Sequence, residues 1–200
     1  MPRFRKTHVA IALIVVLVGL WYWGIRERYW FWCMWIDRQH GPTARWYAEK
    51  LKASPIGVKL ALKDMDIYGG TTRGGSIWIL THSPLSGIVE KELSLFLESP
   101  DMVLSKKQMA ALIMWRRTHD SAYLEKLFYW IKEPGDLGTD IGRKLLALCF
   151  DSDEWKKSLD VPYSEKLPIS DKAFQQMLYQ LSNELQTQPA GGSTYQANFD

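Results

Sequence analysis

The glycine-rich stretch at residues 69–76 has a composition that could support chemistry. It reads GGTTRGGS and precedes a predicted helix, and consecutive backbone N–H groups at such a place can hold a phosphate. A phosphate-binding loop of the NTPase type also requires a lysine before its serine or threonine. Gly75 stands there instead, and no strand is predicted before the loop. We therefore expect a connection between two helices.

Acidic residues and histidines offer two further possibilities for chemistry. Asp64 and Asp66 form the Asp-x-Asp pattern of metal-dependent glycosyltransferases, but those enzymes carry it in an α/β nucleotide-binding domain, and this chain has no run of alternating strands. The four histidines do not share the spacing of metal ligands. We expect no catalytic residue, no metal site and no cofactor, and the chain is not predicted to be an enzyme.

Residues 8–25 (HVAIALIVVLVGLWYWGI) are almost entirely apolar and carry no formal charge. As an α-helix this stretch would be about 27 Å long, which matches the hydrocarbon thickness of a bilayer. Basic residues precede it in the flank at residues 1–7, and Arg26 and Arg28 follow it. The sequence therefore predicts a single transmembrane helix at residues 8–25.

The segment that follows, residues 26–36, is rich in aromatic side chains. Trp and Tyr favour the boundary between membrane and water, where one end of the ring is apolar and the other wet. We expect this segment to extend the anchor helix or to lie in the plane of the interface. The predicted membrane-interface residues are Trp21, Tyr22, Trp23, Arg26, Arg28, Tyr29, Trp30, Phe31, Trp32 and Trp35.

The charge distribution supports this division of the chain. Residues 1–36 hold five basic residues against Glu27, whereas the remainder holds nearly equal numbers of acidic and basic residues. The domain therefore has no bias towards polyanions, and nucleic acid is not an expected partner. Lys and Arg are nearly balanced on the two sides of the predicted span. We expect the N-terminus to be cytoplasmic and the domain extracytoplasmic, an orientation that depends on a small difference in positive charge.

Residues 44–187 are predicted to form an all-α domain, and residues 188–200 a disordered tail. Ser54 and Pro55 have the types that favour a helix start. Near the end of the domain, one apolar stripe at helical spacing predicts a further helix. The stripe consists of Phe174, Met177, Leu178, Leu181 and Leu185.

The domain contains an internal repeat with an offset of 34 residues. Residues 87–100 align without gaps on residues 121–134, so that Leu93 corresponds to Leu127 and Phe96 to Trp130. Such a period predicts stacked helical hairpins, each of which needs its neighbours to cover its apolar face. We expect first helices at 56–66, 87–98 and 121–133, and second helices at 72–83, 105–118 and 139–150.

This pattern resembles tetratricopeptide and HEAT-type repeats over about residues 55–150. Ala110, Ala122 and Pro134 stand where the tetratricopeptide pattern has small residues and a closing proline, whereas Lys106 and Ile113 replace its large aromatic residues. The resemblance concerns the architecture more than either family. It implies a scaffold that binds another protein.

Charge differs between the two sets of predicted helices. The second helices carry a net charge of +6 and the first helices −2. In either repeat framing the second helices line the concave side, so we expect an electropositive surface that attracts an acidic protein segment. The predicted partner-binding residues are Arg73, Lys106, Lys107, Arg116, Arg117, Arg143 and Lys144.

The sequence thus predicts a membrane-anchored helical scaffold, an accessory subunit of a membrane complex whose protein partner has transmembrane helices of its own. A membrane-anchored immunity or inhibitor protein is an alternative within the same binding class. A sensor of lipid head groups, or an envelope enzyme at the bilayer surface, represents the other classes. Cys33 and Cys149 are expected to be free, buried thiols.

Overall fold

A computed structural model describes residues 2–36, 42–68, 74–135, 137–147, 149–150, 153–158, 160–162 and 164–187. Within these ranges every regular element is a helix, which confirms the all-α prediction. The chain starts with α1 (Pro2–Leu20), the π-helical turn η1 (Trp21–Ile25) and α2 (Arg26–Ile36). The others are α3 (Pro42–Lys52), α4 (Pro55–Tyr68), α5 (Gly74–His82), α6 (Ser86–Glu98), α7 (Leu104–Thr118), α8 (Ala122–Ile131), α9 (Leu137–Ala147), α10 (Asp153–Ser158) and α11 (Asp171–Thr187).

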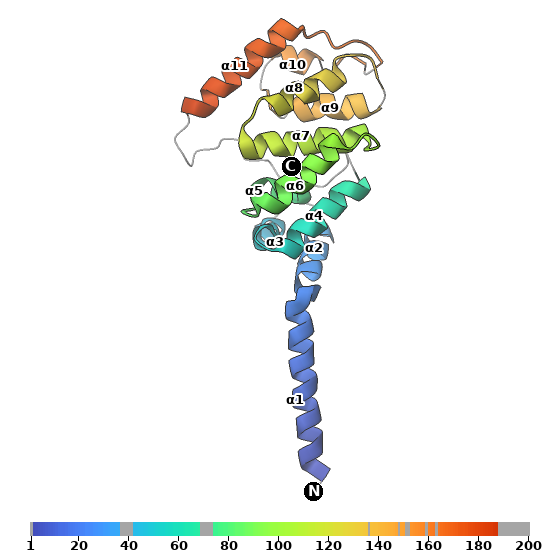
Figure 1. Ribbon diagram of the computed structural model, residues 1–200, viewed down its shortest axis with the longest axis vertical. Coiled ribbons are helices and arrows are strands. Elements are labelled where there is room, and N and C mark those ends of the chain that lie inside the picture. Colours follow the sequence, from blue (N-terminus) through green and yellow to red (C-terminus); the bar gives the residue numbers. More distant parts are fainter. Residues whose placement is uncertain are drawn as a thin grey trace.

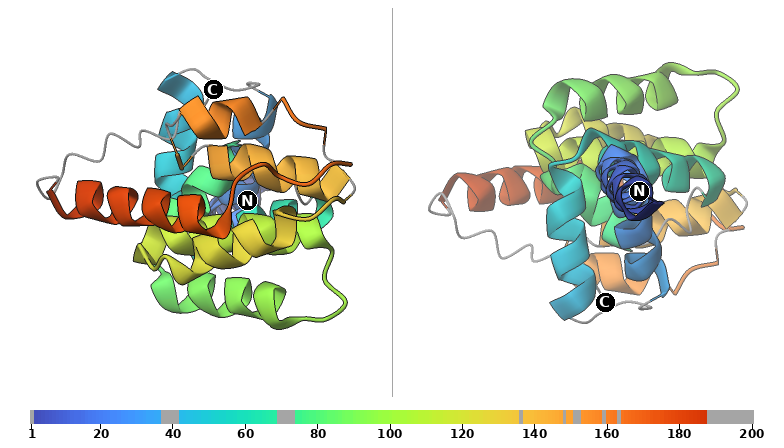
Figure 2. Two further views of the ribbon diagram at one scale, coloured as in Figure 1. Left: turned by 90° about the horizontal axis from the view of Figure 1, so that it is seen from above. Right: turned by 90° about the horizontal axis from the view of Figure 1, so that it is seen from below.

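The molecule consists of a rod, formed by α1 and η1, and a domain of stacked helices (Figure 1). α1 projects from the domain, and α11 lies at the opposite end of the molecule. Seen from below in Figure 2, the rod is viewed end-on against the domain helices. The side chains of α1 described between Val9 and Leu20 are exposed although almost all are apolar.

The segment predicted as one membrane helix at residues 8–25 is not a single regular helix. α1 includes the basic N-terminal residues and ends at Leu20, and η1 follows it directly. None of the helices found in the described ranges has both the length and the apolar content needed to cross a membrane.

Gly24 explains the change of helix geometry in η1. Its φ of +106° lies in a region that side chains with a Cβ rarely adopt. A Cβ at this position would also lie 2.9 Å from Cδ1 of Ile56, at the start of α4. Gly24 therefore permits both the local backbone conformation and the close approach of the rod to the domain.

Consecutive helices of the domain pack in pairs, as the 34-residue offset predicts. α4 contacts α5, α6 contacts α7, and α8 contacts α9, while α7 also contacts α5, α8 and α9. The pairing is compatible with a helical repeat-like fold. Leu93 and Leu127 are both fully buried, and Phe96 and Trp130 are both half-buried against the core.

The start of α4 and the apolar stripe at the C-terminal end also follow the prediction. α4 begins at Pro55, and the Ser54 hydroxyl accepts a hydrogen bond of 3.4 Å from the Gly57 backbone N–H. On α11 the buried members of the stripe include Phe174, which stacks on Phe128 with 3.9 Å between ring centres. The predicted tail at residues 188–200 lies outside the described residues.

α2 is a part of the domain core, although its aromatic sequence predicts an extension of the anchor helix or a segment in the plane of the interface. α2 packs against α3 and α4, and its Met34 belongs to the buried cluster. A Cβ on Gly75 of α5 would lie 2.7 Å from the Met34 sulfur. The glycine-rich stretch thus contributes a packing contact at this point, and its residues 69–73 lie outside the described ranges.

We expect Leu127→Ala to lower the free energy of unfolding by about 2–5 kcal/mol, because it leaves a cavity in a fully buried site. Denaturant unfolding monitored by circular dichroism measures the change. Lys126→Ala, at the exposed neighbouring position, is the control and should change the free energy by less than about 0.5 kcal/mol. Equal effects of the two substitutions would contradict the burial of Leu127.

Candidate functional site

The aromatic residues of α2 divide into two faces. Trp30 and Phe31 pack against the core next to Met34, and Trp30 meets the edge of Trp46 on α3 at 5.8 Å between ring centres. On the other face, Tyr29, Trp32, Trp35 and Ile36 are exposed. One face of α2 therefore attaches the rod to the domain, and the other presents aromatic rings outward.

Three of the exposed rings form what we call the aromatic stripe, which consists of Trp21, Tyr29 and Trp32. The ring centres of Trp21 and Tyr29 lie 6.0 Å apart, and those of Tyr29 and Trp32 lie 6.4 Å apart. These separations are typical of interacting aromatic pairs. The stripe continues from η1 onto α2, so it links the rod to the domain surface.

Arg26 lies at the point where the rod meets the domain. Its guanidinium carbon is 5.3 Å from the centre of the Tyr22 ring and 4.8 Å from that of Trp30. Its Nη2 also donates a hydrogen bond of 2.7 Å to Oε1 of Glu27. Arg28 is exposed, and the side chain of Trp23 lies outside the described set.

Arg117, predicted to bind a partner, is turned into the domain instead. Its Nη1 donates to the backbone carbonyls of Leu80, Thr81 and Ser83 at 2.7–3.2 Å. Its Nη2 donates to the Ser86 hydroxyl at 2.8 Å, and only 5% of its side chain is exposed. Arg117 thus joins α7 to the end of α5 and the start of α6.

Arg143 is likewise turned inward, and only 2% of the residue is exposed. Its Nη1 donates to the carbonyls of Val161 and Pro162, and its Nη2 to the carbonyl of Glu165 at 2.6 Å. Burial lowers the pKa of its guanidinium, which nevertheless stays charged at neutral pH. Arg143 holds the segment between α10 and α11 and is not available on the surface.

The other predicted partner-binding residues do not form one compact patch. Lys106 and Lys107 lie in the first turn of α7 and Arg116 in its last turn, a separation of about 14 Å along the axis from Lys107 to Arg116. Lys144 is exposed and pairs with Asp140 at 2.7 Å. Arg73 lies outside the described residues. The electropositive surface expected from the sequence is reduced, among the described residues, to separate positive charges.

The residues considered for chemistry are engaged in packing and hydrogen bonding within the helices. His82 stacks on Trp78, and its Nδ1 lies 2.9 Å from the Trp78 carbonyl oxygen. Burial lowers the pKa of His82. Asp64 is buried within α4, and the side chain of Asp66 lies outside the described set. Within the described ranges no three His, Cys, Asp or Glu residues are grouped as a metal site would require.

Neither cysteine takes part in a disulfide, and the two differ in burial: Cys33 is half-buried and Cys149 is buried. Burial raises the pKa of Cys149 from 9.0 to about 12. We expect a maleimide at pH 8 to modify Cys149 about a thousandfold more slowly than a thiol of ordinary pKa, because the thiolate is the reactive form. Labelling the Cys33→Ser and Cys149→Ser variants separately, followed by mass spectrometry, measures the two rates. Rapid labelling of native Cys149 would contradict the prediction.

A cavity of about 510 Å³ lies at the junction of rod and domain, and the sequence analysis did not predict it. Its lining comprises Arg26, Glu27, Lys50 and the residues that lead into α4, namely Ala53, Ser54, Pro55 and Ile56. Only Arg26 was recognised from the sequence, by its position after the apolar run. Lys50 and Ser54 carry no sequence signal for this site, because the fold of α3 onto α2 brings them to it.

Comparisons of this chain with family models, with curated proteins and with solved structures found no match.

Proposed function

We propose that the protein is a bitopic membrane protein in which α1 and η1 cross the bilayer and the helical domain stands at its surface. The observation that carries this proposal is the exposure of the apolar side chains described between Val9 and Tyr22, on a helix that projects away from the domain (Figure 1). A helix that is apolar all round is favoured only where other apolar material surrounds it. Within the described chain no domain helix covers α1, so lipid is the surrounding that its composition fits.

The continuity of α1 with η1 supports the required length. Leu20 and Arg26, which flank η1, both have right-handed helical dihedral angles. Residues 8–25 therefore lie in consecutive helical turns, α-helical to Leu20 and π-helical from Trp21 to Ile25, and the positive φ of Gly24 interrupts the last of these turns. We keep the proposed orientation with the N-terminus in the cytoplasm, on the basis of the flanking basic residues.

We further propose that the domain is a scaffold for a protein partner and that the aromatic stripe is the main contact. The stripe exposes large rings next to the proposed span, and aromatic residues are enriched in protein interfaces. A partner with its own transmembrane helix would reach both the rod and the stripe. The exposed Lys144 and the half-buried Lys106, Lys107 and Arg116 would add electrostatic attraction for an acidic partner segment.

Alkaline carbonate extraction of the full-length protein tests the anchor. We expect the wild type in the membrane pellet and the double variant Leu13→Arg/Val16→Arg in the supernatant, because each arginine at a helix centre costs about 2.5–3.5 kcal/mol of insertion free energy. The control Leu95→Arg/Val103→Arg changes exposed apolar residues of the domain and should stay in the pellet. Wild-type protein in the supernatant would overturn the proposal.

Site-specific photo-crosslinking tests the partner contact. A photoreactive phenylalanine analogue at Trp32 is expected to form a crosslink with a membrane-embedded polypeptide in intact cells. The same analogue at Tyr179, which is exposed on α11 at the far end of the molecule, is the control and should not. Crosslinking to lipid alone at Trp32 would favour an interfacial role for the stripe and contradict the scaffold.

A further inference from the structure

The junction cavity combines a buried carboxylate with two basic side chains. Glu27 is only 4% exposed, and its Oε1 accepts the hydrogen bond from Arg26. Its Oε2 is buried and has no hydrogen-bond partner among the described residues. A buried carboxylate oxygen without a donor is costly, and Glu27 lines the cavity, so a rotation of its carboxylate would let a cation bound there donate hydrogen bonds to this oxygen.

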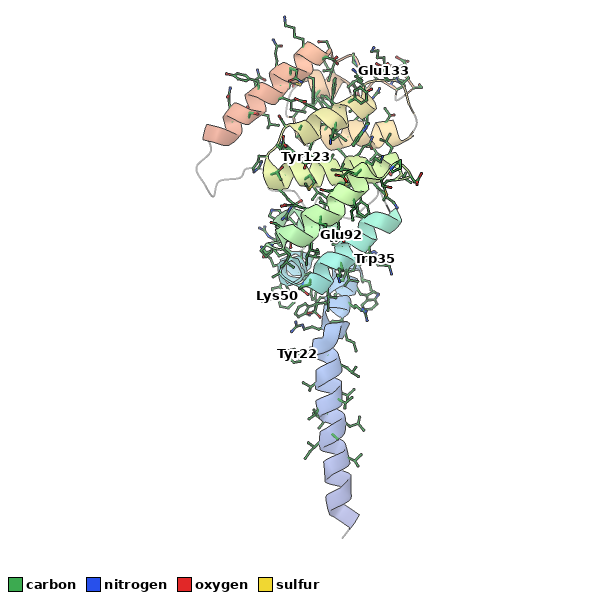
Figure 3. All side chains as sticks on the ribbon, in the orientation of Figure 1. Tyr22, Trp35, Lys50, Glu92, Tyr123 and Glu133 are labelled. Carbon is green, nitrogen blue, oxygen red and sulfur yellow. The ribbon has the colours of Figure 1, made fainter. Side chains whose placement is uncertain are left out.

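The same cavity also offers positive charge for an anion. The guanidinium of Arg26 and the ammonium of Lys50 both line it. α4 begins there at Pro55, and the N-terminal end of a helix favours negative charge. Figure 3 places Lys50 at the end of the domain from which the rod projects, and Tyr22 lies at the same end. The cavity thus presents an acceptor for a cation and donors for an anion within about 510 Å³.

The depth of the cavity along the proposed span indicates the source of such a ligand. Arg26 directly follows residue 25, the last residue of the charge-free run. If residues 8–25 cross the hydrocarbon, Arg26 and Glu27 lie at the level of the phospholipid head groups. This step rests on the proposed membrane anchor.

We infer that the junction cavity binds the head group of a phospholipid that carries a primary amine, of the phosphoethanolamine type. Arg26 and Lys50 bind the phosphate, and Oε2 of Glu27 accepts hydrogen bonds from the ammonium group. A primary ammonium has three N–H donors, whereas the trimethylammonium of choline has none. Choline is bound instead by several open aromatic faces, and Arg26 already lies over one face of each of Tyr22 and Trp30.

The test uses the full-length protein in a mild detergent, titrated with phosphatidylethanolamine or phosphatidylcholine of identical acyl chains and observed by native mass spectrometry. We expect one retained phosphatidylethanolamine, bound about tenfold more tightly than phosphatidylcholine. Glu27→Gln should reduce this preference to less than about twofold, because the neutral amide no longer attracts the ammonium group. Lys50→Gln should weaken the binding of both lipids several-fold.

Two control variants match these changes outside the cavity. Glu49→Gln removes a neighbouring carboxylate that pairs with Lys52, and Arg45→Gln removes an exposed positive charge from α3, the helix that carries Lys50. Both should leave the lipid preference unchanged. If Glu27→Gln disturbs folding, as a lowered melting temperature would reveal, Lys50→Gln at an exposed position carries the test.

The outcomes separate the cavity from the anchor. Equal affinity of the wild type for the two lipids, full preference retained in Glu27→Gln, or unchanged lipid affinity in Lys50→Gln overturns the head-group site even if the protein stays in the carbonate pellet. Release from the pellet overturns the anchor. Soluble glycerophosphoethanolamine should compete only at much higher concentration than the lipid, and equal competition would overturn the assignment to a bilayer lipid.

Discussion

Replacing Arg143 with alanine is expected to lower the free energy of unfolding by about 3–5 kcal/mol. The substitution removes three hydrogen bonds from a buried guanidinium to the carbonyls of Val161, Pro162 and Glu165. Each carbonyl that stays buried without a donor adds to the loss. This segment leads to α11. We therefore also expect Arg143→Ala to accelerate amide hydrogen exchange, relative to the wild type, more in α11 than in α7.

Lys144→Ala is the matched control for Arg143→Ala. Lys144 is the next residue of α9, but 68% of its side chain is exposed and it pairs only with Asp140, four residues earlier. Such a pair contributes about 0.3–0.5 kcal/mol. Urea unfolding followed by circular dichroism in one detergent compares the two variants. Equal losses, or an unchanged stability of Arg143→Ala, would contradict the inward role of Arg143.

Arg117→Ala is expected to lower the free energy of unfolding by a similar amount, about 3–5 kcal/mol, because it removes contacts at a different place in the domain. The guanidinium satisfies carbonyls at the end of α5, where the last turn of a helix lacks internal donors. It also binds the Ser86 hydroxyl at the start of α6. Its removal should therefore loosen the packing of α5 and α6 on α7.

The same unfolding measurement tests this prediction, with Lys107→Ala as the control. Lys107 is a basic residue in the first turn of the same helix, and its removal should cost less than about 1 kcal/mol. Arg117→Lys should recover only part of the stability, because one ammonium cannot reproduce the planar set of donors. Full recovery with lysine would show that charge alone matters at this position.

The sequence predicted the helices because their signals are local or periodic. Ser54 and Pro55 mark the start of α4 by their own chemistry, and Leu93 and Leu127 occupy corresponding places because burial recurs at the repeat offset. Phe174, Met177, Leu178 and Leu181 share one face of α11 by helical spacing alone. These features depend on residues within one helix or one repeat, so the order of residues is sufficient to reveal them.

The junction between rod and domain could not be predicted in this way. Residues 26–36 are as aromatic as a membrane-interface segment, yet one face of α2 is buried because Met34 meets Gly75, which is distant in sequence. Gly24 is needed at that point because Ile56 of α4, which is also distant in sequence, lies against it. The cavity around Glu27 depends on the same contacts.

Whether each of the basic side chains is buried or exposed depends on the tertiary structure alone. By itself, the sequence determined an all-α chain with an apolar N-terminal run, an aromatic segment and paired helices, because composition and period are properties of the chain. It gave Arg116, Arg117, Arg143 and Lys144 the same expected role. Two of these four became buried donors, because the carbonyl ends of other segments lie within reach of Arg117 and Arg143. Which carbonyls need a donor depends on how the helices end and pack together, and no local pattern records it.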